Sequence, residues 1–178
     1  GLGDVYKRQL HDDSCSEYPL DIAVIAPRKE HNYYTLITVN MSNHEVLESD
    51  DIDGNTCHQE LLINLPPDWK LGLSDWTEEK WCWPIRLITS LARQCIRHRT
   101  CISWGKTMEL GGENTFSEDT KLCAIVLLSP SIFGDKSSTC KTQGAGSVEF
   151  YQVIPLYREE LQFIHCLLYT SDAADDLI

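Results

Sequence analysis

One stretch of the chain, residues 77–98 (TEEKWCWPIRLITSLARQCIRH), constrains the fold more than any other. Its apolar residues recur at the three- and four-residue spacing that puts them on one face of an α-helix; they are Ile85, Ile88, Leu91, Ala92 and Cys95. Pro84 is favoured in the first turn of a helix, and Arg93, Arg97 and His98 suit the negative end of the helix dipole. The pattern predicts a helix whose apolar face must be covered by another layer of structure.

Most of the other apolar residues fall in short runs typical of β-strands. The expected strands are residues 20–27, 33–40, 59–65, 100–105, 122–128 and 147–154, with a second helix opening at residue 155. The link between the first two runs suits a hairpin, and Pro66 and Pro67 end the third run. Residues 43–56 are acidic and end in turn formers, so we expect a surface loop. This order predicts a single α+β domain, with packed helices on a mainly antiparallel sheet.

The two ends of the chain are related through the genetic code. Asp4 to Gln9 (DVYKRQ) can be encoded by GAT GTG TAT AAG AGA CAG, and the reverse complement, read one base later, encodes CLLYTS, which is Cys166 to Ser171. One short DNA element therefore accounts for both ends, and it resembles the end of a transposase-based sequencing adaptor. We expect residues 1–9 and 166–178 to be adaptor-derived tails, and residues 10–165 to be a native domain truncated at both ends.

The formal net charge of the chain is −12. An acidic domain is repelled by phosphate backbones and by anionic membrane surfaces, so we expect neither a nucleic-acid nor a membrane partner. No apolar run approaches the ~20 residues that span a bilayer. A basic protein partner would be attracted to such a domain, although acidic surfaces also serve solubility alone.

The cysteines are dispersed. Without the C-terminal tail they are seven, at Cys15, Cys57, Cys82, Cys95, Cys101, Cys123 and Cys140. No two form the C-x-x-C pair that is typical of zinc sites. An odd, scattered set favours buried thiols in a reducing compartment, hence the cytoplasm, over a disulfide framework. The glycosylation triplet at Asn40 favours the opposite, and such triplets are common by chance.

Catalytic and cofactor motifs are incomplete in this sequence. The GKT at residues 105–107 lacks the glycine that a phosphate loop needs five residues earlier, and the GAG at 144–146 lacks the third glycine of a dinucleotide fingerprint. A strand would send His58 and Glu60 to one face and Cys57 to the other, so these three do not form a local metal site. We therefore predict no catalytic, cofactor-binding or metal-binding residues, and a protein that is not an enzyme.

Tryptophan is the residue type that points most towards binding. The chain has five, at Trp69, Trp76, Trp81, Trp83 and Trp104. Tryptophan anchors interfaces because it buries a large area while keeping a polar N–H, although any single tryptophan is more often part of the core. Trp76 and Trp81 have polar, charged neighbours, so we expect these two to be exposed.

Several motifs, taken together, identify a family. PLDIAVIAP, YYTLITVNMS, ELLINLPPDWKL, WPIRLITSLAR, SWGKT and VEFYQVIPLYREEL occur in the order and approximate spacing of the suppressor-of-fused-like domain, from about Leu20 to Phe163. The chain departs from that pattern at Asn40, where relatives tend to have a small residue, and at Lys106, where they tend to have histidine. The resemblance implies an α+β, non-enzymatic protein-binding fold, and the short chain is similar to the bacterial type.

The resemblance also supplies candidate contact residues for a protein partner. They are the motif residues Tyr33, Tyr34, Trp69, Trp83, Trp104, Tyr157, Glu159 and Glu160. Most of them are expected to serve packing or capping, since Glu159 and Glu160 suit the positive end of a helix. The alternative is that Tyr157, Glu159 and Glu160 form an acidic patch that faces a partner.

Three functional hypotheses follow. In the first, suggested by the bacterial members of the family, the chain is an immunity-like protein that neutralises a basic toxin by binding it. In the second, suggested by the animal members that restrain zinc-finger transcription factors, it is a regulator that sequesters a signalling protein, and its native chain is longer. In the third, it is a hydrolase whose pocket joins groups such as His58, Glu60 and a serine.

Overall fold

The computed structural model describes residues 6–12, 18–47, 56–72, 75, 77–130, 139–142 and 146–175 of the 178. The strands are β1 (Tyr6–Asp12), β2 (Leu20–Ile25), β3 (Tyr34–Val39), β4 (Val46–Leu47), β5 (Thr56–Leu65), β6 (Thr107–Glu109), β7 (Ala124–Leu128), β8 (Thr139–Thr142) and β9 (Gly146–Leu156). The helices are the short 3₁₀ turn η2 (Met41–Asn43), α1 (Glu79–His98) and α2 (Arg158–Asp175).

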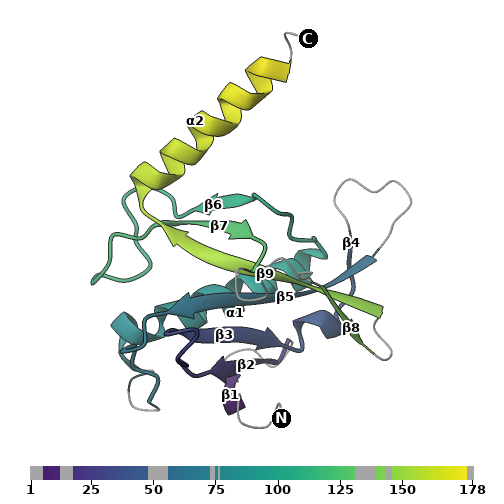
Figure 1. Cartoon of the computed structure of the whole chain (residues 1–178), viewed down its shortest axis with the longest axis vertical. Coiled ribbons are helices and arrows are strands. Elements are labelled where there is room, and N and C mark those ends of the chain that lie inside the picture. Colours follow the sequence, from purple (N-terminus) through teal and green to yellow (C-terminus); the bar gives the residue numbers. More distant parts are fainter. Residues whose placement is uncertain are drawn as a thin grey trace.

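One sheet organises the molecule. Its strand order is β1-β2-β3-β5-β9-β7-β6, with β4 beside β5 and β8 beside β9. Every pair is antiparallel except β5 with β9, which lie parallel. Helix α1 lies behind the sheet in the view of Figure 1, and α2 leaves the end of β9 and projects outward. The predicted single α+β domain with a mainly antiparallel sheet is confirmed.

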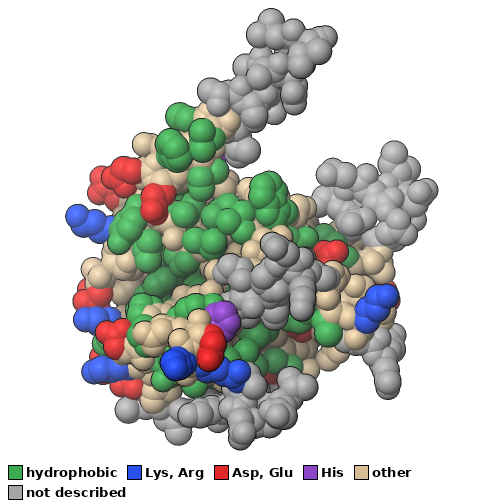
Figure 2. All heavy atoms as spheres, viewed as in Figure 1, with side chains coloured by type: hydrophobic (Ala, Val, Ile, Leu, Met, Phe, Trp, Pro, Cys, Tyr) green, Lys and Arg blue, Asp and Glu red, His purple; other side chains and the backbone are tan. Residues whose placement is uncertain are grey.

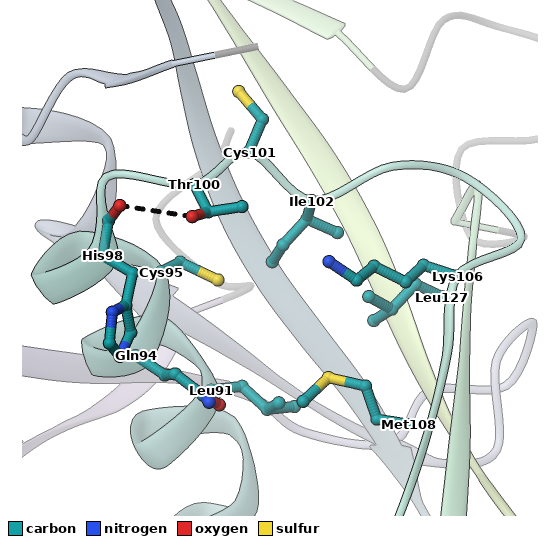
Figure 3. A pocket seen from close by; sticks show the side chains of 10 residues that line it. All are labelled: Leu91, Gln94, Cys95, His98, Thr100, Cys101, Ile102, Lys106, Met108 and Leu127. Atoms are coloured by element: carbon teal, nitrogen blue, oxygen red, sulfur yellow. Dashed lines mark hydrogen bonds between the residues drawn. The ribbon is translucent and has the colours of Figure 1, made fainter. Parts of the chain in front are cut away.

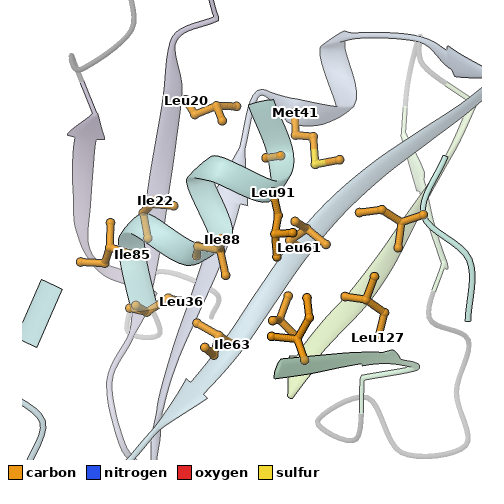
Figure 4. Close-up of a cluster of buried hydrophobic side chains, with 14 of the residues drawn as sticks. Leu20, Ile22, Leu36, Met41, Leu61, Ile63, Ile85, Ile88, Leu91 and Leu127 are labelled. Atoms are coloured by element: carbon orange, nitrogen blue, oxygen red, sulfur yellow. The ribbon is translucent and has the colours of Figure 1, made fainter. Parts of the chain in front are cut away.

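The main core lies between α1 and one face of the sheet (Figure 4). Strand β2 alternates between buried and half-buried residues, as period-2 patterning requires, so Leu20 and Ile22 point to α1. The helix contributes the apolar stripe predicted from the sequence, with Ile88 fully buried and Ala92 beside it. Truncating one buried leucine or isoleucine of such a core to alanine costs about 2–5 kcal/mol.

A smaller cluster forms where α2 begins. Leu161 packs with Ala124, Val126 and Leu156, and Ile164 lies half-buried against them. The later described side chains of this helix, from His165 to Leu167, are exposed. The first turns of α2 therefore carry its packing.

The observed bounds of α1 correct one expectation. Pro84 does not lie in the first turn, because the helix begins at Glu79 and Pro84 lies inside it. Proline has no N–H to donate to the carbonyl four residues earlier, so the carbonyl of Lys80 lacks that helical hydrogen bond. The helix ends at His98, and the next residue, Arg99, caps it in the left-handed conformation (φ 52°, ψ 40°).

The expected strand at residues 100–105 is wrong. Thr100 forms a single parallel bridge with Leu47, and the next strand, β6, begins only at Thr107. The chain turns in between, because Gly105 has a φ of 77° that favours glycine, and the Gly105 N–H donates to the Leu127 carbonyl. The short strands β1, β4, β6 and β8 were not expected from the sequence.

The cysteine interpretation also needs correction. Cys57 of β5 is bonded to Cys101, just after α1, and their Cα atoms lie 6.8 Å apart. Cys82 and Cys123 are free and buried, as expected, whereas Cys140 is exposed. Cysteine usage therefore no longer argues for a reducing compartment.

Neither α1 nor α2, as far as the structure describes them, combines the length and apolar content that crossing a bilayer would require.

Candidate protein-binding surface

The structure separates the eight candidate contact residues. Two of them, Trp69 and Trp83, belong to an aromatic cluster at the start of α1. The ring of Trp83 stacks on Phe116, with centroids 5.4 Å apart and planes at 7°, and only 6% of Trp83 is exposed. Trp69 lies edge-on to Trp83, and its indole N–H donates to the Trp81 carbonyl at 3.0 Å. Trp69 and Trp83 therefore stabilise the fold.

Trp81 is half-buried rather than exposed. Its ring meets Trp69 edge-on, and the ammonium groups of Lys70 and Lys80 each lie 5.2 Å from its centroid. Trp76, the other tryptophan expected to be exposed, lies outside the described residues.

The two tyrosines at the start of β3 are also half-buried. Tyr34 packs against the main core, and the Tyr33 hydroxyl lies 3.2 Å from Nδ1 of His31. Neither presents a large free surface.

Tyr157, Glu159 and Glu160 lie together where β9 passes into α2. The Glu160 carboxylate accepts the Tyr157 N–H at 2.8 Å, which satisfies a donor at the start of the helix. Tyr157 is 46% exposed, and Glu159 is exposed. Glu160 therefore serves as a cap, and Tyr157 with Glu159 remains available on the surface.

Arg158 joins this junction to the loop between β6 and β7. Its guanidinium binds the Glu109 carboxylate and donates to the Gly112 carbonyl at 2.6 Å. The same loop carries further exposed acids and has Lys121 as its one cation. We call this surface the acidic end; it comprises Tyr157 and the carboxylates of Glu109, Glu113, Glu118, Asp119, Glu159 and Glu160. Figure 2 shows Asp and Glu side chains beside apolar ones near the base of α2.

The last of the eight, Trp104, lies at the opposite end of β7. It is 67% exposed, and it stands in the turn whose Gly105 bonds to Leu127. The end of α1 lies nearby, since His98 and Lys106 line one cavity. We call this surface the basic end; it comprises Arg93, Arg97, His98, Arg99, Trp104 and Lys106.

Sequence reasoning missed the basic end because it used the net charge of the whole chain. Residues 80–108 contain six lysines and arginines and no aspartate or glutamate, in a chain with 27 acids and 15 bases. A count in windows along the sequence would have detected this segregation. Helix α1 thus has the acidic Glu79 in its first turn and the basic Arg97 and His98 in its last turn, as its dipole favours.

A buried polar cluster joins η2 to β5. Glu60, only 5% exposed, accepts hydrogen bonds from the Thr38 hydroxyl at 2.6 Å and from the Ser42 hydroxyl at 2.7 Å. The Ser42 N–H also donates to it, and Nδ1 of His58 lies 2.7 Å from the Ser42 carbonyl oxygen. Burial raises the pKa of the Glu60 carboxyl above its usual value, and the hydrogen bonds from Thr38 and Ser42 offset part of this effect.

This cluster joins the residue types of the hydrolase hypothesis without the arrangement that hypothesis needs. A serine nucleophile requires its hydroxyl to meet the histidine, with the carboxylate behind it. Here the Ser42 hydroxyl meets Glu60 directly, and His58 meets the Ser42 backbone. The cluster holds η2 against β5.

No three His, Cys, Asp or Glu side chains among the described residues converge to hold a metal ion. Cys57 is engaged in the bond to Cys101, so it does not join His58 and Glu60.

Comparison with known proteins relates most of the chain to one family. A family model described as Suppressor of fused protein (SUFU) matches residues 16–166. An uncharacterized protein of Ureaplasma parvum serovar 3 is 25% identical over 142 residues, which are 79% of this chain and 64% of the relative. The chain thus spans just under two thirds of the length of that curated relative.

Solved structures share the fold at low identity. A suppressor of fused homologue from Neisseria gonorrhoeae matches with a TM-score of 0.60 at 13% identity, over 99% of this chain and 85% of the other. The Sufu–Fu complex matches with a TM-score of 0.52 at 18% identity, over 81% of this chain and 62% of the other. Drosophila Suppressor of Fused matches with a TM-score of 0.50 at 16% identity, over 81% of this chain and 34% of the other.

Proposed function

Because the chain belongs to the suppressor of fused protein (SUFU) family, we propose that it is a non-enzymatic binding domain that neutralises a partner toxin by occluding it. The observation that carries the proposal is the acidic end, where the exposed carboxylates of the β6–β7 loop and of the start of α2 are joined through Arg158, next to the half-exposed Tyr157. A solved relative is a complex of Sufu with Fu, which supports protein binding as the family's mode of action.

The mechanism has two steps. The acidic end first attracts a basic surface of the toxin, since opposite charges raise the rate of encounter. Tyr157 then buries its ring in the partner, as amphipathic aromatic residues do at the centre of interfaces. The bound domain blocks the surface that the toxin needs, and no bond is made or broken.

The experiment begins with the source DNA. Sequencing outward through both ends of the coding segment identifies the adjacent gene, and its product is then expressed in cells with and without this chain. The proposal expects the neighbour to arrest growth and this chain to restore it. A neighbour that leaves growth unaffected, or an arrest that this chain does not relieve, contradicts the immunity role.

A pair of charge-reversal variants locates the contact. Glu118→Lys with Glu159→Lys, both at the acidic end, should abolish rescue of growth. Glu30→Lys with Glu45→Lys changes the net charge equally at exposed sites elsewhere and should retain rescue. Equal behaviour of the two double variants would show that the acidic end is not the binding surface.

A second candidate function is sequestration of a signalling protein. The observation that favours it is that the chain matches only 62% of the chain in the Sufu–Fu complex. This candidate expects the native reading frame to continue into another domain, with no toxin gene beside it. The same outward sequencing therefore separates the two candidates.

The proposal places the protein in the cytoplasm, where the Cys57–Cys101 pair would be kept reduced. The domain must then fold and bind without this bond. Reduced protein that retains its circular dichroism spectrum and its binding would agree with that placement, and reduced protein that unfolds at growth temperature would exclude it.

A further inference from the structure

We propose that the basic end is a second binding site, and that it takes an acidic segment of a protein that inserts one large apolar side chain beside α1. The inference concerns the end of the molecule opposite the acidic end. It therefore holds or fails independently of the proposed toxin contact.

The first observation is an apolar cavity. It has a volume of about 230 Å³ and lies between α1, the segment after it, and strands β6 and β7. Leu91, Ile102, Met108 and Leu127 are the large apolar side chains in its wall (Figure 3). The volume is below the ~300–1,000 Å³ of typical sites for drug-sized ligands, so it suits a single side chain.

The second observation is the charge around this cavity. Lys106 extends across it towards Ile102, with its ammonium nitrogen inside (Figure 3). Lys106 and the Cys95 thiol line the same cavity, and the positive charge of Lys106 lowers the pKa of that thiol against the larger effect of burial. His98 is the other basic residue that lines the cavity, and its lining contains no aspartate or glutamate.

The third observation is that the basic residues continue beyond the cavity. Arg93 and Arg97 line a neighbouring polar hollow on the outer side of α1, and this hollow shares Gln94 and His98 with the cavity. One small anion at Lys106 would not reach Arg97, which is exposed in the neighbouring hollow. An extended acidic segment fits both, because its carboxylates can follow α1 while one apolar side chain fills the cavity.

The test uses the full chain and short fluorescein-labelled peptides, with affinity measured by fluorescence anisotropy. The probe peptide has a single leucine flanked by Glu and Asp residues. One control peptide replaces the leucine by serine, and another replaces the acids by lysine. We expect the probe to bind on the order of tenfold more tightly than the serine peptide, and the lysine peptide not to bind. Serine and leucine peptides of equal affinity, or no binding of the probe, would overturn the proposal.

Protein variants test the location. Arg97→Glu with Lys106→Glu, both exposed, should weaken binding of the probe by about tenfold or more. Arg28→Glu with Lys121→Glu changes the net charge equally at exposed sites away from the basic end and should stay within about twofold of the wild type. Equal losses in the two double variants would mean that binding depends only on net charge.

Competition by a short DNA duplex as effective as the unlabelled probe would point to a nucleic-acid site and would also overturn the proposal.

Cys95 reports occupancy of the cavity directly. Its sulfur lies in the cavity, and burial raises its pKa to about 11, so alkylation should be followed at mildly alkaline pH. Peptide mapping by mass spectrometry should show that the probe slows alkylation of Cys95 several-fold. The exposed Cys140 should react at an unchanged rate and serves as the internal control. Unprotected Cys95 in the presence of bound probe would contradict insertion into the cavity.

Discussion

The acidic end and the basic end lie at opposite ends of strand β7, and the aromatic residues near them differ in exposure. In the β6–β7 loop that carries most of the acidic end, Phe116 stacks on the buried Trp83, whereas Tyr157 of the acidic end is 46% exposed. At the basic end Trp104 is 67% exposed, beside the segment that lines an apolar cavity. The net charge of −12 therefore conceals two surfaces of opposite charge.

The largest expected effect is a difference in stability between alanine variants of Trp83 and Trp104. Trp83→Ala should lower the free energy of unfolding by about 3–5 kcal/mol, because it leaves a cavity against Phe116. Trp104→Ala removes an exposed side chain and should change it by less than about 0.5 kcal/mol. Urea denaturation measures both. A large loss of stability for Trp104→Ala would mean that the basic end is packed like the acidic end.

The next largest expected effect on stability comes from reducing the Cys57–Cys101 bond. We expect its structural effect mainly at the basic end. It joins residues 44 apart in the sequence, so reducing it should cost about 2–4 kcal/mol. Hydrogen exchange should then quicken in residues 100–106 and remain unchanged in the β6–β7 loop of the acidic end. Equal quickening at both ends would show that the bond stabilises the fold as a whole.

Glu60 is a buried carboxylate that belongs to neither the acidic end nor the basic end. Glu60→Ala should cost about 1–3 kcal/mol, since the Ser42 and Thr38 donors lose their acceptor. Its raised pKa means that the folded state binds the proton more tightly than the unfolded state does. Stability from this group is therefore full below the unfolded pKa and is lost as pH rises through the folded pKa. Denaturation at a series of pH values should show this decline in the wild type and not in Glu60→Gln. Parallel curves would contradict the assignment.

The smallest effect concerns the outer part of α2, which leaves the acidic end. Removing residues 166–178 should change the free energy of unfolding by less than about 0.5 kcal/mol, because Leu161 and Ile164 supply the packing and Cys166 and Leu167 are exposed. Leu161→Ala is the matched contrast and should cost about 2–5 kcal/mol. A truncated chain as unstable as that variant would show that residues 166–178 belong to the fold.

The sequence predicted secondary structure best where apolar residues recur with a clear period over several residues. Six elements were predicted because their apolar residues follow the spacing of a strand or of a helix. They are the strands β2, β3, β5, β7 and β9 and the helix α1. The short strands β4 and β6 were missed, since two or three residues carry no detectable period. Residues 100–105 look β-like, but Gly105 turns the chain there.

The candidate surfaces were harder to predict than the fold. The carboxylates beside Tyr157 were suggested by the helix start, but the link between this helix start and the β6–β7 loop depends on the Arg158–Gly112 hydrogen bond, which is a tertiary contact. The basic end depends on the turn that brings Lys106 back to the end of α1. The Cys57–Cys101 pair likewise spans elements distant in sequence. Contacts between elements that are distant in sequence depend on the topology of the fold. Residue spacing along the sequence does not predict them.

The most direct test of protein binding through the acidic end is the rate at which this chain associates with the product of the adjacent gene. Stopped-flow fluorescence at low and at high salt would measure it for the wild type and for Glu118→Lys with Glu159→Lys. We predict that high salt slows association of the wild type by at least about tenfold and that the variant associates slowly at both salt concentrations. A wild-type rate indifferent to salt, or a variant as fast as the wild type, would contradict it.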